Sequence, residues 1–262
     1  MSNYMEFVND NGNVIVNDSF KNIWLIQKTI INSQGDGANN DTYCFCSSGY
    51  SGIRNTTGNS DYPYWYFVLV PIRENVITFV SCDVPDVLIH MNDIYTYEKR
   101  LSAKRIEFFI PNGKTVDDLL NKVTIYEFSY IVGSVNKGLG LQIFNSNSDK
   151  LFDSNFKYLN IIKSIVDRNK IDGTSYDVGK IAIHYGSYRY TLGSTGNNKV
   201  YHCIRINANK TLSWVKVTLY GGQSNNNIWG VGFVNERDIA HGYSSNEVLL
   251  YSPLLIADVT NY

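Results

Sequence analysis

Apolar and polar side chains alternate along most of the chain with a period of two residues. This period is typical of β-strands that bury one face. Apolar positions at the helical period never persist for more than about three turns, so the pattern predicts an all-β chain with strands at roughly 8–12-residue spacing. The predicted strands are Asn13–Asn17, Lys21–Lys28, Tyr64–Val70, Val76–Ser81, Val87–Met91, Arg105–Ile110, Val123–Val132, Gly140–Phe144, Tyr158–Val166, Lys180–Tyr185, Tyr201–Ile206, Leu212–Tyr220, Trp229–Val234 and Glu247–Ser252.

Two segments depart from this alternation. Asn32–Ser60 is rich in Gly, Asn, Ser and Thr and is predicted to form loop or hairpin. Thr115 precedes a short apolar run, and Asp118 follows it three residues later. This spacing indicates a capping box and one or two helical turns.

The start of the chain recurs 136 residues later. Without a gap, Phe7–Ile26 (FVNDNGNVIVNDSFKNIWLI) aligns with Ile143–Ile162 (IFNSNSDKLFDSNFKYLNII), and apolar strand positions fall on apolar positions. A shift of one residue would turn a strand's side chains to the other face, so the shared alternation indicates a duplicated β unit. We expect two tandem β-sandwich-like units, residues 1–133 and 140–262, joined by a linker at 134–139. The alternative is one large β domain whose hairpins look alike.

Composition narrows the classes of function. The 262 residues include 23 Lys and Arg and 24 Asp and Glu, which gives a net charge of −1. No basic run occurs, which argues against nucleic-acid binding and against a polybasic membrane patch. Charged residues are only 18%, whereas Asn (31) and Tyr (20) are abundant, a mixture typical of loop-rich β proteins that bind other macromolecules.

The sequence predicts neither a signal peptide, a membrane-spanning helix nor a metal site. The first 20 residues have no basic region followed by an apolar one, and the longest apolar run, Tyr64–Pro71, is far below the roughly 20 residues that span a bilayer. The chain is therefore expected to be made in the cytoplasm with reduced thiols. Cys44 and Cys46 lack a second pair at zinc-ligand spacing, so no metal or other cofactor is expected.

The opening hairpins carry a resemblance to a known family. The segments FVNDNGNVIVNDSFKNI (7–23) and LQIFNSNSDKLFDSNFKYL (141–159) resemble the motif that begins each of two β units in tail-associated proteins of tailed bacteriophages and prophages. The Gly-rich linker after Tyr126, Phe128 and Tyr130 is similar to that family, as is Ile77–Leu88. The chain departs from the pattern at Ser148, where the first copy has the turn glycine Gly12.

This resemblance covers both hairpins and the linker, about a third of the chain. It implies a tail or tail-fibre protein that is located in the virion after synthesis in the host cytoplasm. It carries no enzymatic activity, cofactor or site residue to transfer.

Enzyme motifs are lacking in the sequence. No G-x-S-x-G, Walker or H-E-x-x-H motif occurs. His184 and Cys203 both fall in predicted strands, where they are either a Cys–His pair or, as we favour, separate structural side chains. Carboxylate pairs lie in or near turns, whereas a glycosidase needs two carboxylates that converge in a cleft. We expect no enzymatic activity, and a polysaccharide hydrolase is the least favoured alternative.

Two aromatic segments are candidate binding surfaces. Tyr64, Trp65 and Tyr66 put aromatic rings on both faces of one strand, and Tyr188, Arg189 and Tyr190 form a Tyr-rich stretch with one cation. Such residues bind sugars or protein surfaces, although core aromatics and solvated turns are the alternative.

Two functions follow as hypotheses. The first is a structural component of a phage tail tip or tail fibre that assembles with itself and with other tail proteins and acts in host attachment. The second is a receptor- or carbohydrate-binding module for a bacterial surface glycan or outer-membrane protein. A homo-oligomer is expected, without nucleic acid and without membrane insertion.

Overall fold

The structure, a computed structural model, describes residues 6–8, 14–17, 22–36, 41–47, 60–95, 102–130, 140–144, 150–166, 171, 173, 175–185, 190–192, 198–220 and 253–262. The strands are β1 (Glu6–Val8), β2 (Val14–Asn17), β3 (Trp24–Ile31), β4 (Gln34–Asp36), β5 (Phe45–Ser47), β6 (Tyr64–Pro71), β7 (Val76–Cys82), β8 (Leu88–Tyr95), β9 (Ser102–Ile110), β10 (Val123–Ser129), β11 (Gln142–Phe144), β12 (Lys150–Asp153), β13 (Asn160–Ile165), β14 (Ile181–Tyr185), β15 (Tyr190–Leu192), β16 (Asn198–Ile206), β17 (Leu212–Tyr220) and β18 (Leu254–Asp258). These ranges contain no α-helix, and a short 3₁₀ turn, Val116–Leu119, is their helical element. The all-β prediction is confirmed.

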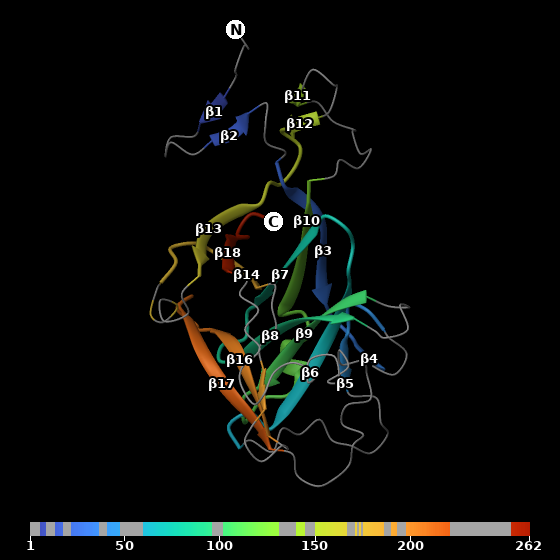
Figure 1. The fold of residues 1–262 in the computed structure, drawn as a ribbon, viewed down its shortest axis with the longest axis vertical. Helices are drawn as coiled ribbons and strands as arrows, with labels where there is room; N and C mark the ends of the chain where they lie inside the picture. Colours follow the sequence, from blue (N-terminus) through green and yellow to red (C-terminus); the bar gives the residue numbers. More distant parts are fainter. Residues whose placement is uncertain are drawn as a thin grey trace.

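Two large sheets form the body of the molecule (Figure 1). One has six strands in the order β13-β18-β14-β7-β10-β3, and the other has the order β15-β16-β8-β9-β6-β5-β4, with β17 beside β16. A single buried cluster joins their inner faces. Val80, Ile125 and Ile183 of the six-stranded sheet pack in that cluster with Val68, Ile89, Ile106 and Phe108 of the larger one. The body is therefore a β-sandwich-like arrangement of two layers.

Both predicted units contribute strands to both sheets. In the six-stranded sheet β3, β10 and β7 come from the first unit, and β14, β18 and β13 come from the second. The units meet where Val80 of β7 pairs with Ile183 of β14. In the larger sheet they meet where Ile89 of β8 pairs with Ile204 of β16. The two halves share their sheets and are not separate beads, and the boundaries at 133 and 140 stay a prediction.

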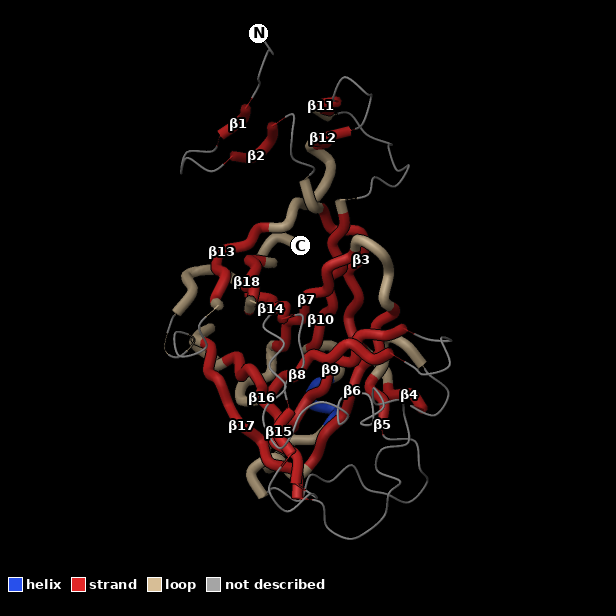
Figure 2. Tube along the Cα trace, viewed as in Figure 1, coloured by secondary structure: helices blue, strands red, loops and turns tan. Residues whose placement is uncertain are grey.

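Two small hairpins stand apart from this body, β1–β2 and β11–β12 (Figures 1 and 2). In the first, Glu6 pairs with Asn17 and Phe7 with Val16. In the second, Gln142 pairs with Asp153 and Ile143 with Phe152. Each paired residue of the second hairpin lies 136 positions after the corresponding paired residue of the first. Both hairpins also have a register shift directly after these pairs. The aligned alternation thus corresponds to one pairing register, while duplication of the whole unit stays a prediction.

Most predicted strands overlap observed ones, but several segments differ. The segment predicted as loop contains β4 and β5, each only three residues long, which pair in parallel. Strand β18 begins at Leu254, after the predicted strand Glu247–Ser252. That predicted strand and Trp229–Val234 lie outside the described residues. At the 3₁₀ turn the backbone N–H of Thr115 donates to Asp118 Oδ2 at 2.7 Å, so the capping box is confirmed.

Candidate functional site

The first predicted aromatic segment lies on β6, with its side chains in three different environments. Tyr64, the first residue of the strand, is 40% exposed. Trp65 is 8% exposed and packs on the outer face of the larger sheet with Phe67 and Phe109. Tyr66 is half-buried against the core between the sheets. Of the three, Tyr64 presents the most surface.

The second predicted segment is only partly placed. Tyr188 and Arg189 lie outside the described residues. Tyr190 is the first residue of β15, and its backbone pairs with Tyr201 of β16. The structure therefore places one of these three residues in the larger sheet and describes no contact between the two aromatic segments.

A buried charged network lies beneath Trp65. The guanidinium of Arg105 is 4.9 Å from the centre of the Trp65 ring and 4.1 Å from that of Phe67. Its Nε is 3.0 Å from Glu107 Oε1, and Glu107 Oε2 is 2.9 Å from His90 Nδ1. His90, Arg105 and Glu107 are all at least 96% buried. Neighbouring strands hold the three groups, because His90 of β8 is directly opposite Glu107 of β9.

Sequence reasoning missed this network. Its signal is the spacing of Arg105 and Glu107, two residues apart and therefore on one face of a strand that also carries Ile106 and Phe108. Burying charges costs free energy unless they are paired. The ion pairs and the cation–π contacts make a structural role for these charges the simplest interpretation.

The structure separates His184 from Cys203. His184 belongs to β14 of the six-stranded sheet, where its Nδ1 is 2.8 Å from the carbonyl oxygen of Thr78. Cys203 belongs to β16 of the other sheet and is fully buried. The Cys–His pair, the less favoured of the two interpretations, is wrong because the residues lie on different layers.

None of the four thiols is activated. All four cysteines are free and buried. Burial raises the pKa of Cys82 to about 12, and burial together with the charge of Glu107 raises the pKa of Cys203 well above its usual value. Burial also raises the pKa of Cys44 and Cys46, whose Sγ atoms are 3.7 Å apart. A nucleophilic cysteine needs the opposite shift, towards the thiolate.

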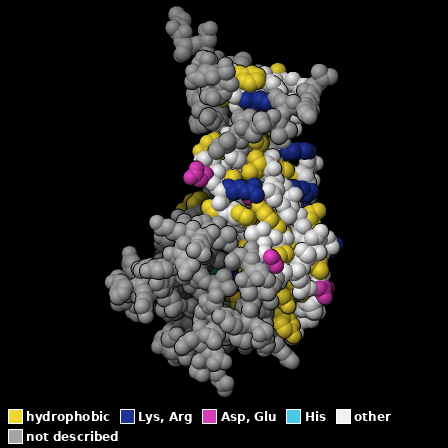
Figure 3. Space-filling view, turned by 90° about the vertical axis from the view of Figure 1, so that its right-hand side faces the viewer, with side chains coloured by type: hydrophobic (Ala, Val, Ile, Leu, Met, Phe, Trp, Pro, Cys, Tyr) yellow, Lys and Arg dark blue, Asp and Glu magenta, His cyan; other side chains and the backbone are white. Residues whose placement is uncertain are grey.

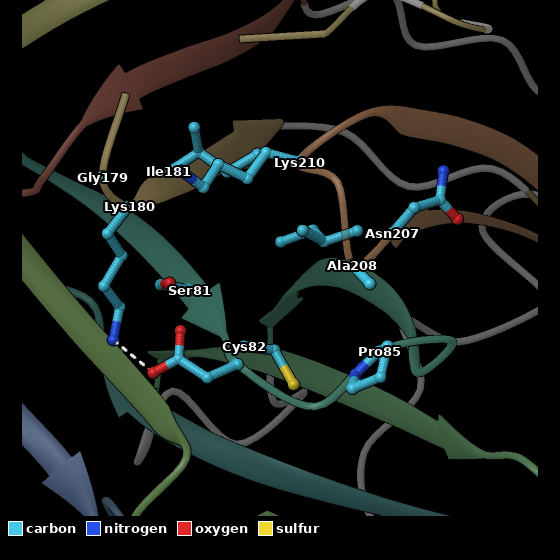
Figure 4. Close-up of a pocket in the computed structure, with 11 residues that line it drawn as sticks. Ser81, Cys82, Pro85, Gly179, Lys180, Ile181, Asn207, Ala208 and Lys210 are labelled. Carbon is cyan, nitrogen blue, oxygen red and sulfur yellow. Dashed lines mark hydrogen bonds and ion pairs between the residues drawn. The ribbon is translucent and has the colours of Figure 1, made fainter. Parts of the chain in front are cut away.

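A cavity of about 240 Å³ opens where the two predicted units meet (Figure 4). Three segments form it: the end of β7 with the turn that follows, the start of β14, and the turn between β16 and β17. The first unit contributes Ser81, Cys82, Asp83 and Pro85, and the second contributes Gly179, Lys180, Ile181, Ile206, Asn207, Ala208 and Lys210. The cavity therefore depends on strands brought together from distant parts of the chain.

Charged and polar groups surround this cavity. Lys180 Nζ is 2.6 Å from Asp83 Oδ2 across one side. Lys210 Nζ donates to the carbonyl oxygen of Val178, and Lys114 Nζ donates to that of Pro85 at 3.0 Å. The lining thus holds two ammonium groups, Lys180 and Lys210, and one carboxylate, Asp83, so the formal charge of the lining side chains is positive.

This arrangement is suited to binding. The lining combines ammonium, carboxylate and hydroxyl groups with the apolar side chains of Ile181, Ile206 and Pro85, so it offers both polar and apolar contacts to a small ligand. The one lining thiol, Cys82, is protonated at neutral pH because burial raises its pKa. Among the described residues, no three His, Cys, Asp or Glu side chains lie close enough to hold a metal ion.

Comparison with known proteins identifies no family, because no protein-family model, no curated protein and no solved structure matches the chain. In the part of the chain that the structure describes, no helix has the length and apolar character needed to cross a membrane.

Proposed function

We propose that this protein is a non-enzymatic structural component of a phage tail tip or tail fibre, acting in virion assembly and host attachment. The proposal begins with the tail-protein motif in the two opening hairpins. It is supported by their common pairing register, because the same motif at both positions forms the same local structure.

The observation that carries the assembly role is the pair of edge strands of the six-stranded sheet. β3 and β13 end the sheet's strand order on either side. The start of β3 is bonded to the segment before β13, because the N–H of Leu25 donates to the Lys157 carbonyl at 2.7 Å, and the rest of β3 remains an edge. Ile26 and Ile30 of β3 are 39% and 48% exposed, and Ile161 of β13 is 44% exposed. Exposed apolar edges favour pairing with another chain, and soluble monomers generally protect them.

The composition of the surface supports the same role. Over the described part of the face in Figure 3, apolar side chains are scattered among backbone and uncharged polar side chains, with a few basic and a few acidic side chains between them. Interfaces that assemble are depleted in charge at their centres. The raised pKa values of the thiols support a role without covalent catalysis.

The test of this proposal is the oligomeric state of the full chain by light scattering, together with binding of the labelled chain to a panel of bacterial cells. A defined oligomer is expected, and Ile161→Lys should shift it towards the monomer because a charge would enter the edge. The matched control is Asn112→Lys, at an exposed position of the turn after β9 and outside both edge strands. A monomer that binds no strain and no virion protein would refute the proposal.

A receptor- or carbohydrate-binding module is the second candidate function, and the cavity favours it. In this case the chain binds one bacterial strain saturably even as a monomer. Saturable binding that Ile161→Lys leaves intact, while the oligomer dissociates, would favour this second function over a purely structural one.

A further inference from the structure

We infer that the cavity between β7, β14 and the β16–β17 turn binds one acidic monosaccharide unit, such as a uronic acid of a bacterial surface polysaccharide. This inference deepens the host-attachment part of the proposed function and rests on it. It names the class of ligand and the residues that would recognise it.

The positive charge of the cavity selects an anion. Lys180 and Lys210 line it, and each ammonium group has three N–H donors. Asp83 accepts from Lys180, and the Val178 carbonyl accepts from Lys210, so both groups have donors left for a ligand. Figure 4 shows the Lys180 ammonium group directed towards Asp83, and a carboxylate beside either ammonium group would receive charge-assisted hydrogen bonds.

An acceptor at the rim of the cavity selects hydroxyl groups beside that anion. The amide nitrogen of Asn207 donates to Thr211 Oγ1 at 2.8 Å and to Ser213 Oγ at 3.1 Å, and Figure 4 shows this amide directed away from the other lining side chains. The acceptor that faces a ligand is therefore the Asp83 carboxylate, 46% exposed at the rim. A simple anion such as phosphate would be repelled by Asp83, whereas a sugar hydroxyl would donate to it.

The size and walls of the cavity fit a single ring. About 240 Å³ is below the range of roughly 300–1,000 Å³ for sites that hold drug-sized ligands, so an oligosaccharide would extend beyond it. Ile181, Ile206 and Pro85 offer an apolar wall for the C–H groups of a sugar ring. A ligand of this size with these few contacts is expected to bind with a Kd of about 1 mM.

The decisive experiment titrates the full chain by NMR or calorimetry with three probes: glucuronate, glucose and inorganic phosphate. Glucuronate should bind with a Kd of about 1 mM, and glucose and phosphate at least about 10-fold more weakly. Lys210→Gln should weaken glucuronate binding by about 10-fold or more. Lys163→Gln, at an exposed position on β13, is the matched charge control and should leave it unchanged.

A second variant tests the cavity independently, in case Lys210→Gln loses binding because it disturbs the fold. Ala208 lines the cavity from an exposed position of the β16–β17 turn, so Ala208→Phe fills the cavity without removing a charge or a buried contact. This variant should melt like the parent chain and lose glucuronate binding. If both variants bind glucuronate as the parent chain does, the cavity is not the site and the inference is wrong.

The remaining outcomes separate the two proposals. Equal affinity for phosphate and glucuronate would overturn the sugar assignment in favour of a plain anion site. Absence of glucuronate binding, with saturable binding to cells retained, would overturn the inference and leave the proposed function standing. Glucuronate binding by a monomer that attaches to no cell would support the sugar site and refute its role in attachment.

Discussion

At the scale of single residues, the outer face of the larger sheet buries a charged group and thiols that its apolar pattern does not indicate. Trp65 was predicted as a surface residue, and its ring instead covers the guanidinium of Arg105 inside a buried cluster. The same face carries the thiols of Cys44 and Cys46, and the backbone of Gly35 closely approaches the thiol of Cys44. Close packing at Gly35 leaves no room for an added methyl group.

Gly35→Ala is predicted to destabilise the protein by about 1–3 kcal/mol, the usual cost of overpacking. A Cβ at residue 35 would lie 2.4 Å from Cys44 Sγ and 2.9 Å from Asp41 Oδ2. Asp41 is exposed and can move away, but Cys44 is buried and cannot. Urea unfolding of Gly35→Ala, Cys44→Ala and the double variant measures the effect.

The double variant serves as the internal control of this prediction. Cys44→Ala removes the sulfur that would clash, so in its background Gly35→Ala should cost much less than in the parent chain. Equal costs in the two backgrounds would show that the close approach of Gly35 to Cys44 does not limit packing there.

At the scale of elements, alternation alone predicted most strands because each one buries a face against the core. Strand β17 has the predicted bounds, and β6 and β7 differ from theirs by one residue. Strands β4 and β5 were missed because three residues are too few to show a period, and their parallel pairing depends on distant partners. Strand pairing order, the buried network and the cavity all arise from contacts between distant segments, which no local pattern encodes.

The second hairpin has a polar anchor that can be tested by titration. The carboxylate of Asp153 accepts from the backbone N–H of Asn155, from Lys150 Nζ and from Gln142 Nε2, each at 3.0 Å. Burial alone would raise the pKa of Asp153, but the hydrogen bonds from Asn155 and Lys150 and the charge of Lys150 outweigh it and hold the pKa below its ordinary value. Asn17 occupies the equivalent place in the register of the first hairpin.

We predict that Asp153 titrates below about 3.9, the value for an unfolded chain, in an NMR titration of its carboxyl carbon. A lowered pKa in the folded state adds stability above about pH 4, and this stability is lost as the pH falls through the folded-state pKa. Lys150→Ala should raise the Asp153 pKa, whereas Lys163→Ala should not. A midpoint at or above about 4 in the parent chain would contradict the prediction.

At the scale of the whole molecule, the sandwich joins the two predicted units by sheet pairing and by a common core. Of the 27 described residues in the central cluster, 17 precede residue 134 and 10 follow residue 139. The cavity lies on this same junction, since both units line it. The proposed ligand site therefore requires the intact chain, whatever the evolutionary origin of the two hairpins.

The last prediction follows from that shared core: residues 1–139 alone should not fold cooperatively. Without the second unit, β7 and β8 lose a neighbouring strand and become edge strands. The first unit also loses contact with the ten described side chains that the second unit buries in the central cluster. Each such side chain contributes about 1.5–3 kcal/mol on burial, whereas a domain's net stability is only about 5–15 kcal/mol. Denaturant unfolding followed by far-UV circular dichroism should show a broad, non-cooperative transition for 1–139 and for 140–262, and a sharp one when both are co-expressed. A monomeric 1–139 fragment with a sharp transition would show that the first unit is an independent domain and that the shared core adds little to its stability.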